Sequence, residues 1–210
     1  MMKFKTALLE YNKEEVIKFT RENLDKEYGV RDFYYDYILD SLSSIGNEVS
    51  IEKYDIVEEH LCTAILRTSI EICYEYILNE KEKPCNKSVV VCGLENELHE
   101  LPPRITADFF LLNGFDTYFL GTNIPNEDII NSILHLNVDY IAISITNFLK
   151  LTDLHKLIEM IKEKTECKIV IGGLAVINNR EYCQNLGADY ILLNFDEIGE
   201  ILDETSNKNS

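Results

Sequence analysis

The sequence predicts an α/β protein in which an N-terminal helical bundle precedes a doubly wound, five-stranded parallel sheet of the flavodoxin or Rossmann type. Residues 1–80 have helical periodicity and little strand signal. Residues 81–87 are charged and polar and contain Pro84, which is typical of a linker. In residues 88–204, apolar runs alternate with helical segments, as in a parallel sheet covered on both faces. The polar residues 205–210 are expected to form a frayed tail.

The N-terminal part is expected to contain about four helices. Residues 8–28 predict one amphipathic helix, and residues 30–46 predict a second that ends near Gly46, a natural C-cap residue. Residues 51–80 predict either one long helix or two shorter ones. Amphipathic helices in succession bury their apolar faces against one another, so a bundle is the expected arrangement.

The C-terminal part contains the strands and the helices between them. The predicted strands are KSVVVCG (87–93), FDTYFLG (115–121), DYIAISIT (139–146), CKIVIGG (167–173) and ADYILLN (188–194). The helical segments begin near Pro102, Asn126, Thr152, Asn178 and Asp196. Right-handed crossovers would build a doubly wound sheet, in which ligands bind beyond the carboxyl ends of the strands.

Composition restricts the partners of the chain. The net charge of −17 repels phosphate backbones and anionic membranes, so neither nucleic acid nor a membrane is an expected partner. No apolar run approaches the roughly 20 residues that span a bilayer. The start of the chain has no signal-peptide pattern, so we expect a cytoplasmic protein. The six cysteines form no C-x-x-C pair and are expected to be free thiols.

Candidate ligand-binding residues follow the predicted strands. The sequence has no G-x-G-x-x-G after the first strand and no G-x-x-x-x-G-K-[ST], so the common nucleotide sites are not expected. Instead, a histidine, a small hydroxyl residue and a glycine pair follow three different strands. The candidates are Glu97, His99 and Pro102 after the first strand, Gly121 at the end of the second, Ser144 and Thr146 around the end of the third, and Gly172 and Gly173 after the fourth.

In combination, these motifs resemble the cobalamin-binding domain family. The pattern of that family is D-x-H-x-x-G, then S-x-L or S-x-T, then GG. This chain has E-x-H-x-x-P, S-x-T and GG, with Ser144 45 positions after His99 and Gly172 28 positions after Ser144. The stretch NGFDTYFLGTNIP, which contains Gly121, also resembles the second strand and loop of the family. The resemblance covers roughly residues 87 to 192.

The resemblance implies a role for each motif. His99 would be the lower cobalt ligand, and Glu97 would hold its other ring nitrogen and so fix the tautomer. Ser144 would support this pair or contact the displaced nucleotide tail of the cofactor. Gly172 and Gly173 would let that tail pass close to the backbone.

Two residues depart from the family pattern. Glu97 replaces Asp and is one methylene longer. Pro102 replaces the closing glycine, and it lacks an N–H and cannot adopt a positive φ. Corrin affinity would fall if the backbone must approach the corrin there, although proline suits the first turn of the following helix.

The N-terminal part resembles the helical cap of the same family. Methyl-carrying corrinoid proteins have such a cap, and light-sensing regulators of the MerR type have one with the pattern W-x9-E-H. Here Glu59 and His60 match the E-H pair, and Val49 stands where the tryptophan would be. The resemblance implies that Glu59 contacts an upper ligand and that His60 is a second candidate cobalt ligand. Val49 implies a smaller upper ligand or a more open pocket.

Three functional hypotheses follow. The first is a cobalamin-binding sensor without enzymatic activity, possessing a His-ligated cobalt under a helical cap. It would bind adenosylcobalamin or methylcobalamin, respond to light, and signal through a protein partner or self-association. The second is a corrinoid methyl carrier, which would be a component of a methyltransferase system. The third is a module that binds haem through His60 and His99, or a degenerate tetrapyrrole module.

Overall fold

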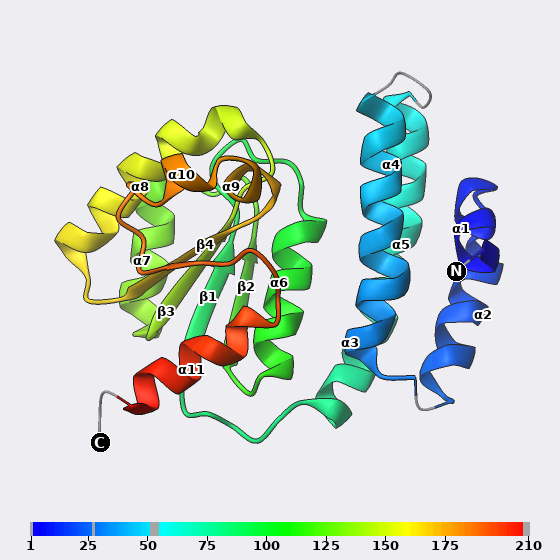
Figure 1. The fold of residues 1–210 in the computed structure, drawn as a ribbon, viewed down its shortest axis with the longest axis horizontal. Coiled ribbons are helices and arrows are strands. Elements are labelled where there is room, and N and C mark those ends of the chain that lie inside the picture. Colours follow the sequence, from blue (N-terminus) through cyan, green and yellow to red (C-terminus); the bar gives the residue numbers. More distant parts are fainter. Residues whose placement is uncertain (1, 27, 51–54, 208–210) are drawn as a thin grey trace. The chain divides into compact units, whose positions relative to one another are not determined.

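The computed structural model describes residues 2–26, 28–50 and 55–207, and side chains within 3–26, 28–46 and 55–202. The chain forms two compact units, Met1–Glu80 and Lys81–Ser210 (Figure 1). The first unit is helical, and the second contains a parallel sheet with helices on both faces. The predicted fold class is therefore confirmed.

The helical unit begins with two short helices, α1 (Met2–Leu9) and α2 (Lys13–Leu24). The prediction of one helix over residues 8–28 is wrong, because the chain turns at Tyr11, which has a φ of +56°. Asn12 then starts α2, since its side-chain oxygen accepts the backbone N–H of Glu15 at 3.1 Å. An asparagine at the N-cap satisfies a helix donor that would otherwise lack a partner.

Two longer helical segments complete this unit. α3 (Val30–Phe33), the π-helical turn η1 (Tyr34–Leu39) and α4 (Asp40–Ser50) follow one another without a break. The helix therefore continues through Gly46, which is not the predicted C-cap. α5 (Ile56–Glu80) is one long helix. Its start is capped by Asp55, whose carboxylate accepts the N–H groups of Val57 and Glu58 at 2.8 and 2.9 Å.

Aromatic packing helps to hold the helical unit together. The rings of Phe4, Phe19, Phe33 and Tyr37 lie with centroids 5.0 to 5.9 Å apart. Edge-on and tilted contacts of this kind stabilise a core by more than the burial of their area alone.

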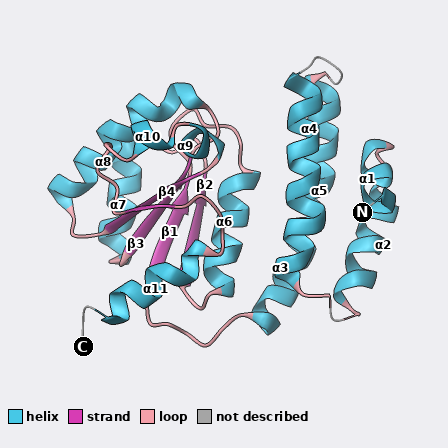
Figure 2. Cartoon of the chain, in the orientation of Figure 1, coloured by secondary structure: helices cyan, strands magenta, loops and turns pink. Residues whose placement is uncertain are grey.

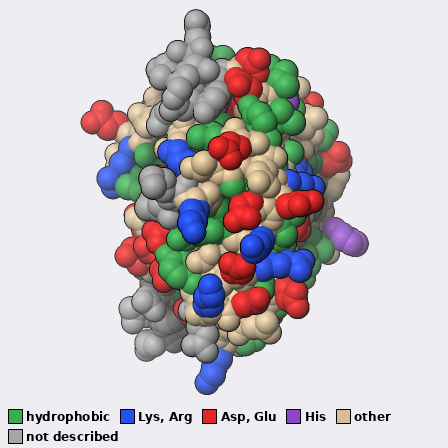
Figure 3. All heavy atoms as spheres, turned by 90° about the vertical axis from the view of Figure 1, so that its right-hand side faces the viewer, with side chains coloured by type: hydrophobic (Ala, Val, Ile, Leu, Met, Phe, Trp, Pro, Cys, Tyr) green, Lys and Arg blue, Asp and Glu red, His purple; other side chains and the backbone are tan. Residues whose placement is uncertain are grey.

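On the face that Figure 3 shows, acidic and basic side chains are interspersed, so the negative net charge does not form one patch there.

The second unit is built on a five-stranded sheet in the order β2-β1-β3-β4-β5, with every neighbouring pair parallel. This is the flavodoxin-like order of doubly wound sheets. The strands are nearly continuous in apolar residues because helices cover both faces. Their bounds are β1 Ser88–Cys92, β2 Asp116–Gly121, β3 Tyr140–Ser144, β4 Lys168–Gly172 and β5 Tyr190–Ile191.

Helices cover the two faces of the sheet (Figure 2). α7 (Asn126–Leu136) and α8 (Leu151–Lys164) share one apolar core with the side chains of one face. α6 (Leu101–Leu112) and α11 (Glu197–Asn207) lie on the opposite face in Figure 1. The remaining helical segments are η2 (Phe148–Lys150), α9 (Leu174–Asn178) and α10 (Arg180–Cys183).

Two predicted boundaries in this unit are wrong. The helical segment predicted to begin near Asn178 consists of two short helices: α9 already begins at Leu174, directly after Gly173, and α10 begins at Arg180. Helix α11 continues to Asn207 and so includes the first part of the predicted tail. The first boundary was predicted too late and the second too early, each by a few residues. Apolar periodicity identifies helices more reliably than it locates their ends.

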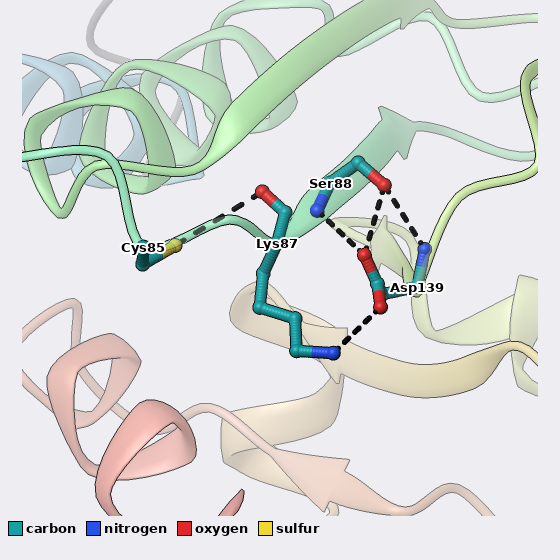
Figure 4. Close-up of polar contacts among 4 residues, drawn as sticks. All are labelled: Cys85, Lys87, Ser88 and Asp139. Atoms are coloured by element: carbon teal, nitrogen blue, oxygen red, sulfur yellow. Dashed lines mark hydrogen bonds and ion pairs between the residues drawn. The ribbon is translucent and has the colours of Figure 1, made fainter. Parts of the chain in front are cut away.

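Aspartates at the amino edge of the sheet tie neighbouring strands together. The carboxylate of Asp139, which precedes β3, accepts Lys87 Nζ at 2.7 Å, Ser88 N at 2.9 Å and Ser88 Oγ at 3.0 Å (Figure 4). Asp189 repeats the arrangement before β5, because it accepts the side chain of Lys168 and the backbone of Ile169, both at 2.9 Å. Each carboxylate therefore fixes the register of two strands where they begin.

Among the described residues, no helix combines the length and the apolarity needed to cross a membrane. The six cysteines are free, and four of them are buried.

Candidate functional site

The candidate site lies at the carboxyl edge of the sheet, between the loops that follow β1 and β3. These strands are neighbours, although β2 lies between them in the sequence. The chain therefore leaves β1 toward one side of the sheet and β3 toward the other. This switch point is where doubly wound sheets bind ligands.

Glu97 is the centre of the site. Its side chain is 1% exposed, and its two oxygens accept four N–H groups from both loops. Oε1 accepts the ring Nδ1–H of His99 at 2.5 Å and the backbone N–H of the same residue at 3.2 Å. Oε2 accepts the backbone N–H groups of Thr146 and Asn147 at 3.0 and 3.1 Å. A buried carboxylate needs such partners to remain charged.

The hydrogen bonds determine the charge of Glu97. Burial by itself would raise the pKa of this carboxyl group, because it disfavours the charged form. The ring of His99 and the N–H groups of Asn147, His99 and Thr146 outweigh burial and lower the pKa of Glu97 to about 2. Glu97 is therefore an anion at neutral pH.

His99 presents its imidazole at the surface beside this anion. Its side chain is 50% exposed. Because a carboxylate can only accept, the hydrogen bond to Glu97 assigns a proton to Nδ1, and in the neutral ring the lone pair is then on Nε2. The nitrogen suited to bind a metal is thus Nε2, on a ring whose orientation is set by Glu97.

The glycine pair after β4 packs against the loop after β3. The carbonyl of Gly172 accepts the N–H of Ile145 at 2.9 Å. Gly173 has a φ of +97°, and a Cβ atom added to it would lie 2.4 Å from the carbonyl oxygen of Ile145. No other residue fits there without moving the backbone. Gly173 is therefore required by the packing of the protein itself.

Pro102 lies in the first turn of α6, where its missing N–H costs no helical hydrogen bond. Its carbonyl oxygen accepts the hydroxyl of Thr106 at 2.9 Å. Substitution of the family glycine by proline is thus compatible with the local fold.

The other predicted residues of this unit are placed as follows. Ser144 ends β3 and is 3% exposed, but within the described part of the chain its hydroxyl makes no hydrogen bond to Glu97. Thr146 contributes its backbone N–H to Glu97. Gly121 ends β2 with a φ of +88°, and no atom of the described residues lies within 4 Å of an added Cβ. Its carbonyl oxygen accepts the N–H of Gly93 at 2.9 Å.

Two further residues of the site were not predicted. Asn147 donates its backbone N–H to Glu97, and Asn123 accepts the N–H of Asn96 at 2.9 Å and so connects the loops after β1 and β2. Asparagine is favoured in turns, where its side chain bonds to nearby backbone groups. The sequence SITN, which directly follows the strand, therefore carried a signal for Asn147.

The residues predicted to contact an upper ligand belong to the helical unit. Glu59 and His60 lie in the first turns of α5, with His60 Nε2 4.0 Å from a carboxylate oxygen of Glu59. The side chain of His60 is 72% exposed. Val49 lies in α4, and its side chain is outside the described residues. The roles of these three residues stay predictions.

The donor set indicates which metal group the site could hold. The described residues include no cluster of three or more His, Cys, Asp or Glu side chains that could hold a metal ion. A metal bound at His99 would therefore have to bring most of its own ligands, as in a macrocycle. Large apolar side chains are exposed in the segments that follow β1, β3 and β4, namely Leu98, Phe148, Leu149 and Leu174. One imidazole ligand amid exposed apolar side chains fits a tetrapyrrole better than a bare ion.

Known proteins agree with this assignment. The family model described as B12 binding domain matches residues 87–202, and a second B12 binding domain model matches residues 2–74. Dimethylamine corrinoid protein 3 of Methanosarcina mazei is 24% identical over 117 residues, which are 54% of this chain and 69% of that protein. The dimethylamine corrinoid protein of Methanosarcina barkeri is 26% identical over 105 residues, or 48% of each chain.

Solved structures share the fold. The monomethylamine corrinoid protein of Methanosarcina barkeri superimposes with a TM-score of 0.82 at 16% identity, and the match covers 97% of this chain and 96% of that one. A cobalamin-binding protein from Desulfitobacterium hafniense has a TM-score of 0.50 at 18% identity, with 97% and 96% covered. The match to the first family model covers more than half of the chain and includes the loops of the carboxyl edge described above. The chain therefore belongs to the B12 binding domain family, and its cofactor is a corrinoid of the cobalamin type.

Proposed function

We propose that this chain is a corrinoid protein that carries a methyl group between methyltransferase partners, with His99 as the lower cobalt ligand. The observation that carries the proposal is the hydrogen bond of 2.5 Å between Glu97 and Nδ1 of His99, which directs Nε2 to a ligand. The relatives that match this chain include two dimethylamine corrinoid proteins. They support a methyl carrier, which was the second hypothesis from the sequence, over a sensor.

A bound corrinoid supplies a cobalt atom that can accept a methyl group and release it. This chain would supply a ring nitrogen of His99 to hold the cobalt, and Glu97 would set the orientation of that ring. Glu97 remains charged, holds the Nδ1–H of His99 and raises the basicity of Nε2, as carboxylates do for histidines that bind metals. The hydrogen bonds from the loop after β3 keep Glu97 in place, so the ring of His99 would keep its orientation when the cofactor is bound.

The remaining predicted residues keep their proposed roles. Ser144 and the Gly172–Gly173 pair would border the nucleotide tail of the cofactor. Gly121 and Pro102 would also contact the cofactor. Glu59 and His60 would contact an upper ligand. The partner would be a protein, so the chain would act as a component of an enzyme system.

Neither of the other two hypotheses gains support. The light-responsive sensor was the first hypothesis, but the relatives and structures reported above include no light-sensing regulator. Haem binding was the third, and the family match favours a corrinoid.

The test is methyl loading of the reconstituted protein. The chain is loaded with cobalamin, reduced to the Co(I) form and treated with methyl iodide, and the visible spectrum is recorded. We expect a protein-bound methyl–cobalt spectrum that is lost when a thiol acceptor and a corrinoid-dependent methyltransferase are added. Absence of methyl transfer, together with a change of oligomeric state when the adenosylcobalamin form is illuminated, would instead establish the sensor.

A further inference from the structure

We propose that Asn147 is a positioning residue for His99. Asn147 acts through Glu97 by means of its backbone N–H, and the side chain of Asn147 holds this N–H in place. The family motif of the loop after β3 ends at Thr146, so it assigns no role to the next residue. The inference rests on the proposed function only for the identity of the ligand that His99 binds.

The loop after β3 supplies half of the hydrogen bonds of Glu97. Thr146 and Asn147 direct consecutive backbone N–H groups to Oε2, at 3.0 and 3.1 Å. Consecutive N–H groups converge on one anion only where the backbone is held in a defined turn. If this turn relaxes, Glu97 loses donors and can rotate away from the ring of His99.

The side chain of Asn147 holds that turn from its C-terminal side. Its Oδ1 accepts the N–H of Leu149 at 3.0 Å, and its carbonyl oxygen accepts the N–H of Lys150 at 3.0 Å. Asn147 therefore caps η2 in the manner of an N-cap residue. Without this cap, the N–H of Leu149 would have no acceptor within the turn and would have to bond to water, so the start of η2 would fray.

The opposite side of the turn is fixed by other residues. Ile145 donates its N–H to the carbonyl of Gly172, and its own carbonyl accepts the N–H of Ala175 at 3.1 Å. The segment is thus anchored at Ile145 by the glycine pair and at Asn147 by the cap. The cap can be removed by mutation without deleting either N–H donor to Glu97, which makes the role of Asn147 testable.

The experiment uses two variants of the full chain without cofactor. Asn147→Ala removes the capping oxygen, and Asn147→Ser restores a capping oxygen without adding charge. Nuclear magnetic resonance of the labelled imidazole of His99, at a pH where the ring is neutral, measures the ratio of the Nδ1–H to the Nε2–H tautomer. We expect this ratio to fall in the alanine variant, with an upper bound of about fivefold, which corresponds to the whole worth of a cap, about 1 kcal/mol, acting on the tautomer equilibrium. The serine variant should resemble the wild type.

An unchanged tautomer ratio in the alanine variant would overturn the inference, and so would failure of serine to restore the ratio. A purely structural role would lower the unfolding temperature and leave the tautomers as they are. If the alanine variant does not fold, Asn147→Gln takes its place, because the longer amide cannot cap the same turn. If the wild type fails to bind cobalamin but the tautomer effect is present, the proposed function fails and the positioning role stands.

Discussion

Gly173 and Gly172 are adjacent in the sequence, but the structure predicts very different costs for replacing them with alanine. In Gly173→Ala, the new Cβ would lie 2.4 Å from O, 2.8 Å from N and 3.0 Å from C of Ile145. The backbone of Gly173, with φ +97° and ψ 170°, lies in a region adopted almost only by glycine, which adds roughly 1–3 kcal/mol for a residue with a side chain. Relief of the overlap requires backbone movement, which typically costs about 1–3 kcal/mol. The sum, about 2–6 kcal/mol, is a large part of the stability of an ordinary domain.

Gly172→Ala is the matched control. Its added Cβ would lie 3.4 Å from the Cβ of Leu192, an ordinary contact, so we expect a change below about 1 kcal/mol. Urea unfolding followed by circular dichroism measures both free energies. If Gly173→Ala destabilises the protein no more than Gly172→Ala, the close packing of the glycine pair against Ile145 is refuted.

Three further predictions concern other parts of the chain. Burial would raise the pKa of Asp139, but hydrogen bonds from Lys87 and Ser88 outweigh burial and lower it. The stability that the ionised carboxylate gives to the fold is therefore complete above the ordinary carboxyl pKa and is lost as pH falls through the lowered pKa. Because about a third of the Asp139 side chain is exposed, Asp139→Asn should lower the free energy of unfolding by only about 1 kcal/mol at neutral pH. In a plot of the urea unfolding midpoint against pH, the fall at acidic pH should be less steep in this variant; an unchanged fall would contradict the prediction. Asn12→Ala should destabilise the helical unit by about 1 kcal/mol in the same assay, whereas Asn12→Ser should not. Pro102→Gly should lower stability by about 0.4–1 kcal/mol, and it should tighten cobalamin binding in a spectroscopic titration only if proline hinders the corrin.

The sequence predicted the α/β unit better than the helical unit. Nearly continuous apolar runs such as SVVVC identify buried parallel strands, and the family spacing located His99 and Glu97. The helix over residues 8–28 was mispredicted because its apolar period continues across Tyr11 and Asn12, so that the break depends on one cap. Similarly, glycine is a natural C-cap residue, but Gly46 lies within α4, and no atom of the described residues lies within 4 Å of an added Cβ.

The contacts within the site were harder to predict than its location. Motif spacing indicates that two loops meet, but it does not tell which atoms bond. Glu97 accepts the backbone N–H groups of Thr146 and Asn147. The residue type of Asn147 indicates a turn, but the sequence does not tell that the N–H groups of this turn bond to Glu97. Likewise, the glycine pair was explained by room for a nucleotide tail, whereas Gly173 is also required by its contact with Ile145.

The central claim is that Nε2 of His99 binds cobalt from below. Electron paramagnetic resonance of the Co(II) cobalamin form tests it most directly, because an axial nitrogen splits the cobalt lines. With the imidazoles isotopically labelled and the cofactor unlabelled, we predict a splitting that follows the label in the wild type. The splitting should persist in His135→Ala, a histidine in the last turn of α7, and be absent in His99→Ala. A label-dependent splitting that survives in His99→Ala would contradict the account.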